Sequence, residues 1–108
     1  MEQRVFVDRE EKEFLCTDNG IFDIDVATEK NDFPNKGEVT ICEKWLKKNV
    51  EPRKKIKLNK SSYSYKHDVE EKAGKYVSNG AFIQACINLG YDVFPHCPNA
   101  YFNFRMKK

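Results

Sequence analysis

The sequence predicts a single α+β domain with a small N-terminal sheet, three helices and a C-terminal β-hairpin. Three observations lead to this fold class. The chain has 108 residues, which is room for one domain. Its hydrophobic content of 40% and aromatic content of 13% are those of a folded globule. Strand-type runs lie near both ends, and apolar residues recur at helical spacing between them.

The first part of the domain, residues 1–37, is acidic and is predicted to be a β-hairpin or small antiparallel sheet. Asn19 and Gly20 suit a tight turn because both accept positive φ values. After them, apolar residues alternate with Asp23 and Asp25, as expected for a strand with one solvated face. We expect strands at 4–7, 13–16 and 21–26, and a loop at 27–37.

Residues 38–108 are basic and are predicted to hold the helices. The first helix, at 38–49, places four apolar residues on one stripe: Ile41, Cys42, Trp45 and Leu46. Pro52 prevents easy continuation. The segment 53–60 alternates roughly and reads as an extended segment or short strand. A second helix is expected to begin within 61–64, where serines are candidate N-caps, and to stop at Gly74.

The third helix has the clearest start signal in the chain. Ser78 is the candidate N-cap, and Val77 with Phe82 would form a hydrophobic staple around it. Gly90 closes the helix. Two further strands, at 91–94 and 100–105, complete the predicted hairpin.

Two helices, a short turn, a third helix and a hairpin follow each other as in a winged helix-turn-helix. The turn at 74–78 has a suitable length, and 79–89 would then be the recognition helix. Its outward residues would include Asn79, Gln84 and Asn88, whose amides are able to hydrogen-bond base edges. Against this assignment, the helix carries no Lys or Arg, whereas most groove-reading helices carry at least one.

The net charge of +2 is unevenly distributed along the chain. Residues 1–38 hold five Lys/Arg against eleven Asp/Glu, whereas residues 39–108 hold fourteen against six. This asymmetry indicates contact with nucleic acid or with an acidic protein surface, and a solvated charged face is the plain alternative. The predicted nucleic-acid-binding residues are Lys44, Lys48, Arg53, Lys54, Lys55, Lys57, Lys60, Asn79, Gln84 and Asn88.

Cysteine and histidine spacing argues against a metal site. The four cysteines are widely spaced and form no Cys-x-x-Cys pair, and with His67 and His96 they fit no common zinc pattern. Cys42 and Cys86 lie in apolar helical patterns and are expected to be core residues. We therefore expect no cofactor and no disulfide.

Catalytic motifs are also lacking in the sequence. There is no Gly-rich phosphate loop, Ser elbow or metal-binding His pair. His67 and Glu71, four residues apart, could form a pair, but a helix-stabilising contact explains that spacing equally well. We expect a protein that is not an enzyme and has no small-molecule substrate. With no signal-peptide pattern and no long apolar stretch, we expect a cytoplasmic protein without a membrane partner.

Several short blocks in residues 40–104 resemble a family of small, largely uncharacterised proteins encoded by bacteriophages, prophages and plasmids. The blocks are 61–67 (SSYSYKH), 76–83 (YVSNGAFI), Gly90-Tyr91 and 98–103 (PNAYFN). The resemblance implies a mobile-element setting in a bacterial cytoplasm and assigns no residue a role.

Together these observations predict an accessory protein that binds nucleic acid through its basic face and the helix at 79–89. The alternative is a phage-encoded inhibitor that binds a host protein, for example a component of a defence system. In that case an acidic sheet holding Asp18, Asp23 and Asp25 would present a nucleic-acid-like surface.

Overall fold

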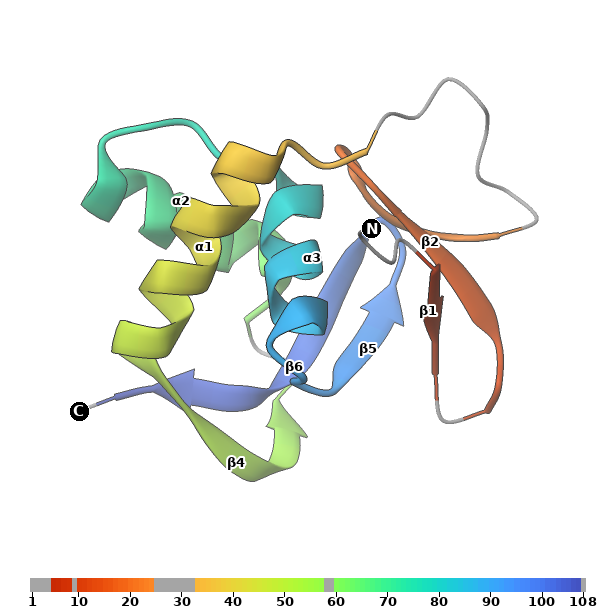
Figure 1. Ribbon diagram of the computed structural model, residues 1–108. Helices are drawn as coiled ribbons and strands as arrows, with labels where there is room; N and C mark the ends of the chain where they lie inside the picture. Colours follow the sequence, from red (N-terminus) through yellow and green to blue (C-terminus); the bar gives the residue numbers. More distant parts are fainter. Residues whose placement is uncertain (1–4, 9, 25–32, 58–59, 108) are drawn as a thin grey trace.

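The computed structural model describes residues 5–8, 10–24, 33–57 and 60–107, without the side chains of Val5 and of 55–57. Two three-stranded antiparallel sheets and three helices form the fold (Figure 1), which confirms the α+β class. In chain order the elements are β1 (Val5–Val7), β2 (Glu13–Thr17), β3 (Gly20–Asp23), α1 (Lys36–Asn49), β4 (Val50–Lys57), α2 (Ser62–Ala73), α3 (Asn79–Asn88), β5 (Val93–His96) and β6 (Asn99–Met106).

The N-terminal sheet has the order β1-β2-β3, and the predicted hairpin is confirmed. Its tight turn lies where Asn19 and Gly20 suggested, with Thr17 opposite Gly20 and a φ of 142° at Gly20. Val26 and Asp25, which were expected to continue the last strand, lie outside the described residues, as does most of the loop predicted at 27–37.

The helices begin and end within two residues of the predicted positions because local caps define them. Ser78 accepts a hydrogen bond from the Ala81 N–H and caps α3, as predicted. Gly74 ends α2 in the left-handed conformation, with a φ of 68°. Asn35 caps α1 by accepting from the Glu38 N–H.

The second sheet has the order β4-β6-β5, so the C-terminal strand β6 is central. Ala100, Phe102 and Phe104 alternate along β6 and point into the core. Between Pro52 and Lys57 the pairing of β4 with β6 shifts register. Ser62, at the start of α2, accepts a hydrogen bond from the Ala100 N–H and so ties α2 to the central strand.

Helix α3 lies at the centre of the molecule and contacts α1, α2 and both sheets (Figure 1). Its Phe82 packs against Trp45 of α1, Tyr65 of α2 and Phe102 of β6, with ring centroids 5.5–6.2 Å apart. Cys42 and Cys86 are fully buried, as expected of core residues, and burial raises the pKa of the Cys42 thiol to about 12. Within the described ranges, no helix has the length and apolarity to cross a membrane.

Candidate functional site

The predicted recognition helix is not a surface helix. Every residue of α3 from Asn79 to Cys86 is buried, and Gln84 is only 1% exposed. The prediction that Asn79 and Gln84 face outward is therefore wrong, whereas Asn88 is exposed. The N-terminal sheet packs on α3 through β2 and β3, and the buried residues from Asn79 to Cys86 offer no base-reading surface.

The amide of Asn79 instead joins three parts of the chain. Its Nδ2 donates to the Asn19 carbonyl oxygen at 3.4 Å, to the Pro98 carbonyl oxygen at 3.2 Å and to Asn99 Oδ1 at 2.9 Å. The polar residue thus satisfies backbone acceptors of two turns that are distant in sequence. Gln84 likewise bonds internally, donating to Asn88 Oδ1 at 2.8 Å.

A groove between α1 and α2 gathers the lysines that the sequence singled out on the first helix. Lys44 and Lys48 are one helical turn apart and so share a face of α1. Lys72 of α2 meets them there because the buried Val69 packs α2 against α1. We call this site, of about 240 Å³, the lysine groove; its rim is Lys44, Lys48, Asn49 and Lys72, and its floor is Ile41, Trp45, Val69 and Ala73.

The three cations of the lysine groove have no acidic partner in the described ranges. All three lysines are exposed, and in the described part of the chain no carboxylate lies within ion-pair distance of any of them. Lys47, also exposed, lies in the same last turn of α1. Basic residues there stabilise a helix C-terminus, which is their ordinary structural role. Lys72 was not among the predicted site residues. Its place depends on how α2 packs against α1, and a local sequence pattern does not predict such a tertiary contact.

The other predicted basic residues do not join this groove. Lys60 forms an ion pair with Asp68 at 2.6 Å and lies 4.8 Å from the centroid of the Tyr65 ring, so its charge is already compensated. Arg53 is half-buried and Lys54 is exposed on β4. Lys55 and Lys57 belong to the same strand, but their side chains lie outside the described ones.

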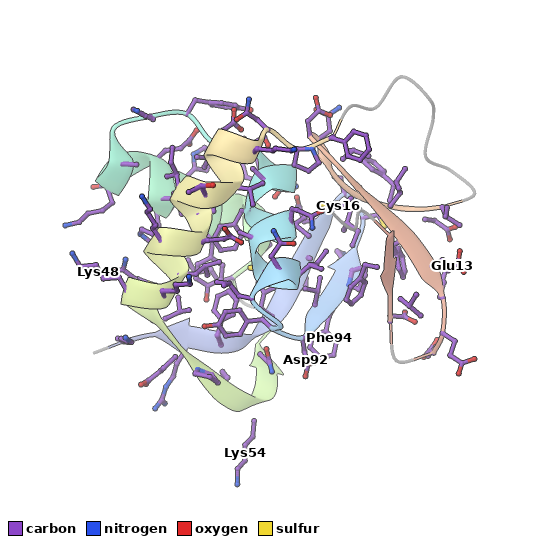
Figure 2. All side chains as sticks on the ribbon, in the orientation of Figure 1. Glu13, Cys16, Lys48, Lys54, Asp92 and Phe94 are labelled. Carbon is purple, nitrogen blue, oxygen red and sulfur yellow. The ribbon has the colours of Figure 1, made fainter. Side chains whose placement is uncertain are left out.

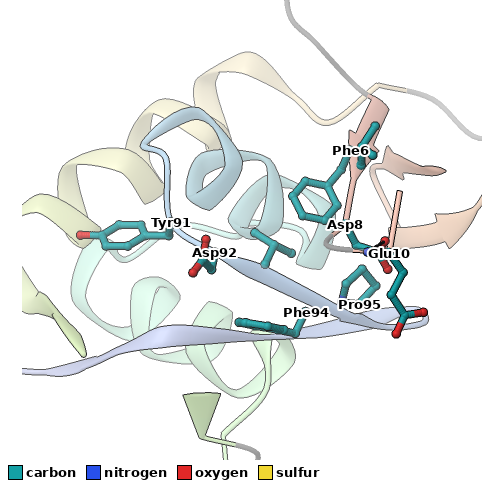
Figure 3. A pocket seen from close by; sticks show the side chains of 9 residues that line it. Phe6, Asp8, Glu10, Tyr91, Asp92, Phe94 and Pro95 are labelled. Atoms are coloured by element: carbon teal, nitrogen blue, oxygen red, sulfur yellow. Dashed lines mark hydrogen bonds between the residues drawn. The ribbon is translucent and has the colours of Figure 1, made fainter. Parts of the chain in front are cut away.

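Charge is segregated in space as well as in sequence. Figure 2 shows Lys48 on the α1 side of the molecule and Glu13 on β2, the central strand of the N-terminal sheet, at the opposite end. A cavity of about 490 Å³ also lies at this end, between β1 and β5 (Figure 3). We call it the acidic groove; its apolar wall includes Phe6, Tyr91, Val93, Phe94 and Pro95, and its carboxylates are Asp8, Glu10 and Asp92.

Two of these carboxylates already accept hydrogen bonds within the fold. Asp8 Oδ1 accepts from the Glu10 and Lys12 N–H groups, each at 2.9 Å, and so shapes the turn between β1 and β2. Asp92 Oδ2 accepts from Asn103 Nδ2 at 3.2 Å. Glu10 is exposed and is the acidic-groove carboxylate best placed to meet a partner.

The ionisable groups nearest to a catalytic arrangement surround Glu70. Its Oε2 accepts from the buried Lys66 ammonium at 3.4 Å and from the Val77 N–H at 3.3 Å, and its Oε1 contacts His67 at 3.0 Å. His67 therefore pairs with Glu70 rather than with Glu71. Lys66 Nζ also donates to the Val77 carbonyl oxygen at 3.3 Å, so the cluster fixes the turn between α2 and α3.

Glu70 gives the fold a defined response to acid. Burial tends to raise the pKa of its carboxyl group, but the Val77 N–H, the Lys66 ammonium and His67 together lower it. A lowered folded pKa stabilises the protein above the ordinary glutamate pKa of about 4.3, and this contribution is lost as pH falls through the folded value.

We expect Glu70→Gln to lower the free energy of unfolding by about 3 kcal/mol at pH 7, because it leaves the Lys66 charge buried without its counter-ion. The difference in the free energy of unfolding between wild type and Glu70→Gln should become smaller in acid, where the wild-type Glu70 side chain is protonated and uncharged. Urea unfolding from pH 7 to pH 3 measures both effects. Glu71→Gln, on the exposed next residue, is the matched control and should change stability little. Equal stability of both variants at pH 7 would contradict this role.

Among the residues with described positions, no three His, Cys, Asp or Glu side chains converge as a metal site would require. Comparisons with protein-family models, curated proteins and solved structures give no match to this chain.

Proposed function

We propose that the protein binds nucleic acid, without catalysis, through the lysine groove. The observation that carries this proposal is the convergence of Lys44, Lys48 and Lys72 on one groove, with no acidic partner among the residues whose positions are described. Ammonium groups that are not already paired can neutralise phosphates. This releases the counterions condensed on the nucleic acid, which is the main source of affinity in sequence-independent binding. The carboxylates of the acidic groove lie at the other end, where they do not repel a strand bound to the lysine groove.

The proposed binding mode differs from that of a winged helix. The order α1-β4-α2-α3-β5-β6 with the sheet order β4-β6-β5 supports a winged-helix-like scaffold. With α3 covered, contacts to phosphates from α1 and α2 replace insertion of a helix into the major groove. We therefore expect little dependence on duplex sequence, because phosphate contacts position a protein without reading bases.

Fluorescence-anisotropy titrations with random duplex DNA, single-stranded DNA and RNA at several salt concentrations test the proposal. Each phosphate contact contributes about 0.9 to the slope of log affinity against log salt for duplex DNA. Binding that weakens steeply with salt and does not depend on duplex sequence is the expected result. Absence of binding to all three probes at low salt would overturn it.

A second candidate function uses the opposite end: a mobile-element-encoded inhibitor that docks on a host protein through its acidic sheet. The acidic groove favours this function, since an apolar wall beside Glu10 suits a basic, partly apolar segment of a partner. Asp23, one of the residues first suggested for this surface, forms an ion pair with Lys12 at 2.8 Å, and Asp25 lies outside the described residues.

If the second candidate is correct, Glu10→Lys should abolish capture of one host protein from a bacterial lysate, because it places like charges in the contact. Lys72→Glu, which alters the lysine groove, should leave that capture intact. Affinity purification with mass spectrometry compares the two variants with wild type. If Lys72→Glu lost the captured host protein and Glu10→Lys retained it, the acidic groove would be excluded as the docking site.

A further inference from the structure

A further cavity lies where four segments meet: the start of α2, the 74–78 turn, and the turns that end at Gly20 and Asn99. Its volume is about 370 Å³. We call it the tyrosine pocket. Tyr63 and Tyr76 border it, together with Asp18, Lys66, Asn79 and Asn99. None of these side chains belongs to the lysine groove.

The rings of the two tyrosines contact one shared cation. The Lys66 ammonium lies 5.4 Å from the centroid of the Tyr63 ring and 4.7 Å from that of Tyr76, so a single buried cation holds both rings by cation–π contact. Lys66 is in turn held by Glu70 and by the Val77 carbonyl oxygen. Even so, Tyr63 is 52% and Tyr76 is 66% exposed, which leaves ring surface open to a planar ligand.

The side chains of Asp18 and Asn79 line the pocket beside the rings. Asn79 is only 7% exposed, and because its Nδ2 donates to three oxygens, its Oδ1 must be the atom that needs a donor. In the described part of the chain neither Asn79 Oδ1 nor Asp18 Oδ1 receives a hydrogen bond. Both oxygens are covered in this structure. Asp18 is only half-buried, so rotation of its carboxylate would present an acceptor to a bound donor.

We propose that the tyrosine pocket takes an unpaired nucleobase that carries an exocyclic amino group. The base stacks on Tyr63 and Tyr76, as in proteins that bind single strands. Its amino group donates to Asp18, whose half-buried carboxylate rotates toward the pocket on binding. This inference rests on the proposed function, which it deepens to a preference for single strands. Lys72 of the lysine groove and the exposed Lys75 lie within four residues of Tyr76 in the chain.

Oligo(dC) and oligo(dU) of equal length make a matched pair of probes, because cytosine has an amino group where uracil has a carbonyl. We expect wild type to bind oligo(dC) several-fold more tightly than oligo(dU), and both more tightly than a duplex of equal length. Tyr63→Ala and Tyr76→Ala should each weaken single-strand binding about tenfold and leave duplex binding unchanged. Tyr63→Phe and Tyr76→Phe retain the ring and should bind single strands as wild type does.

The outcomes separate this inference from the proposed function. Salt-dependent binding that is equal for duplex and single strand, and unchanged in the alanine variants, would overturn the base pocket and leave the lysine groove in place. Absence of binding to every probe would overturn both. Tighter binding of an arginine-rich peptide than of oligo(dC), lost in the alanine variants, would assign the pocket to a guanidinium group of a protein partner and contradict the inference.

Discussion

Replacing Gly80 with alanine is expected to lower the free energy of unfolding by about 3 kcal/mol or more, at the upper end of what overpacking costs. A Cβ atom at this position would lie 1.5 Å from the Thr17 carbonyl oxygen and 2.9 Å from the Asp18 carbonyl carbon. Both are backbone atoms and cannot rotate away. The helix and the β2–β3 turn would have to separate, which also breaks the hydrogen bond from the Gly80 N–H to the Asp18 carbonyl oxygen at 3.3 Å.

The sign of this effect opposes helix propensity, which makes the test informative. In an exposed helix, alanine is more favourable than glycine by about 1 kcal/mol. Gly37, on the exposed first turn of α1, is the matched control: its added Cβ would approach only the Asn35 side chain, at 3.2 Å. Chemical denaturation of both variants compares them. Gly37→Ala should stay within about 1 kcal/mol of wild type. Wild-type stability of Gly80→Ala would contradict the packing of the N-terminal sheet on α3.

That packing also explains why the sequence predicted helix boundaries well and the role of α3 poorly. Ser78 and Gly74 are local signals, since a cap and a left-handed stop act within one helical turn. Whether a helix face is covered depends on a partner distant in sequence. Polar Asn79 and Gln84 were read as surface residues, but the fold uses Asn79 to join two turns and buries Gln84 inside the domain.

Prediction of the candidate site from the sequence was limited in the same way, because tertiary contacts were not predicted. The sequence located basic residues on the first helix, and Lys44 and Lys48 do share one groove. It did not identify Lys72, whose place depends on how α2 packs against α1. Nor did it identify the ion pair of Lys60 with Asp68, which removes Lys60 from the set of uncompensated cations. Composition thus predicted the sign of the charged face, and tertiary contacts determine which residues form it.

Reversing the lysine groove in Lys44→Glu/Lys48→Glu/Lys72→Glu is expected to weaken nucleic-acid binding about 100-fold at low salt. The estimate takes about 1 kcal/mol for each lost charge contact in water, and a tenfold change in affinity for every 1.4 kcal/mol. Because the three side chains are exposed, the fold should survive, and thermal unfolding checks that it does. Replacing the same three lysines with arginine keeps the charge and should preserve binding.

A change of net charge alone could also weaken binding. Two single substitutions separate this general effect from the loss of contacts in the lysine groove. Lys36→Glu and Lys72→Glu alter the net charge equally, but Lys36 is exposed at the opposite, N-terminal end of α1. We expect Lys72→Glu to weaken binding clearly more than Lys36→Glu. Equal losses would mean that overall charge, and not the groove, governs affinity.

The most direct test of the lysine groove is the salt dependence of duplex-DNA affinity for wild type and the triple glutamate variant, measured by fluorescence anisotropy. If the three lysines each contact a phosphate, the slope of log affinity against log salt should fall by about 2.7 in the variant. A wild-type protein that binds with a steep slope, and a variant that keeps that slope, would place the nucleic-acid contacts elsewhere and contradict the proposed function of the groove.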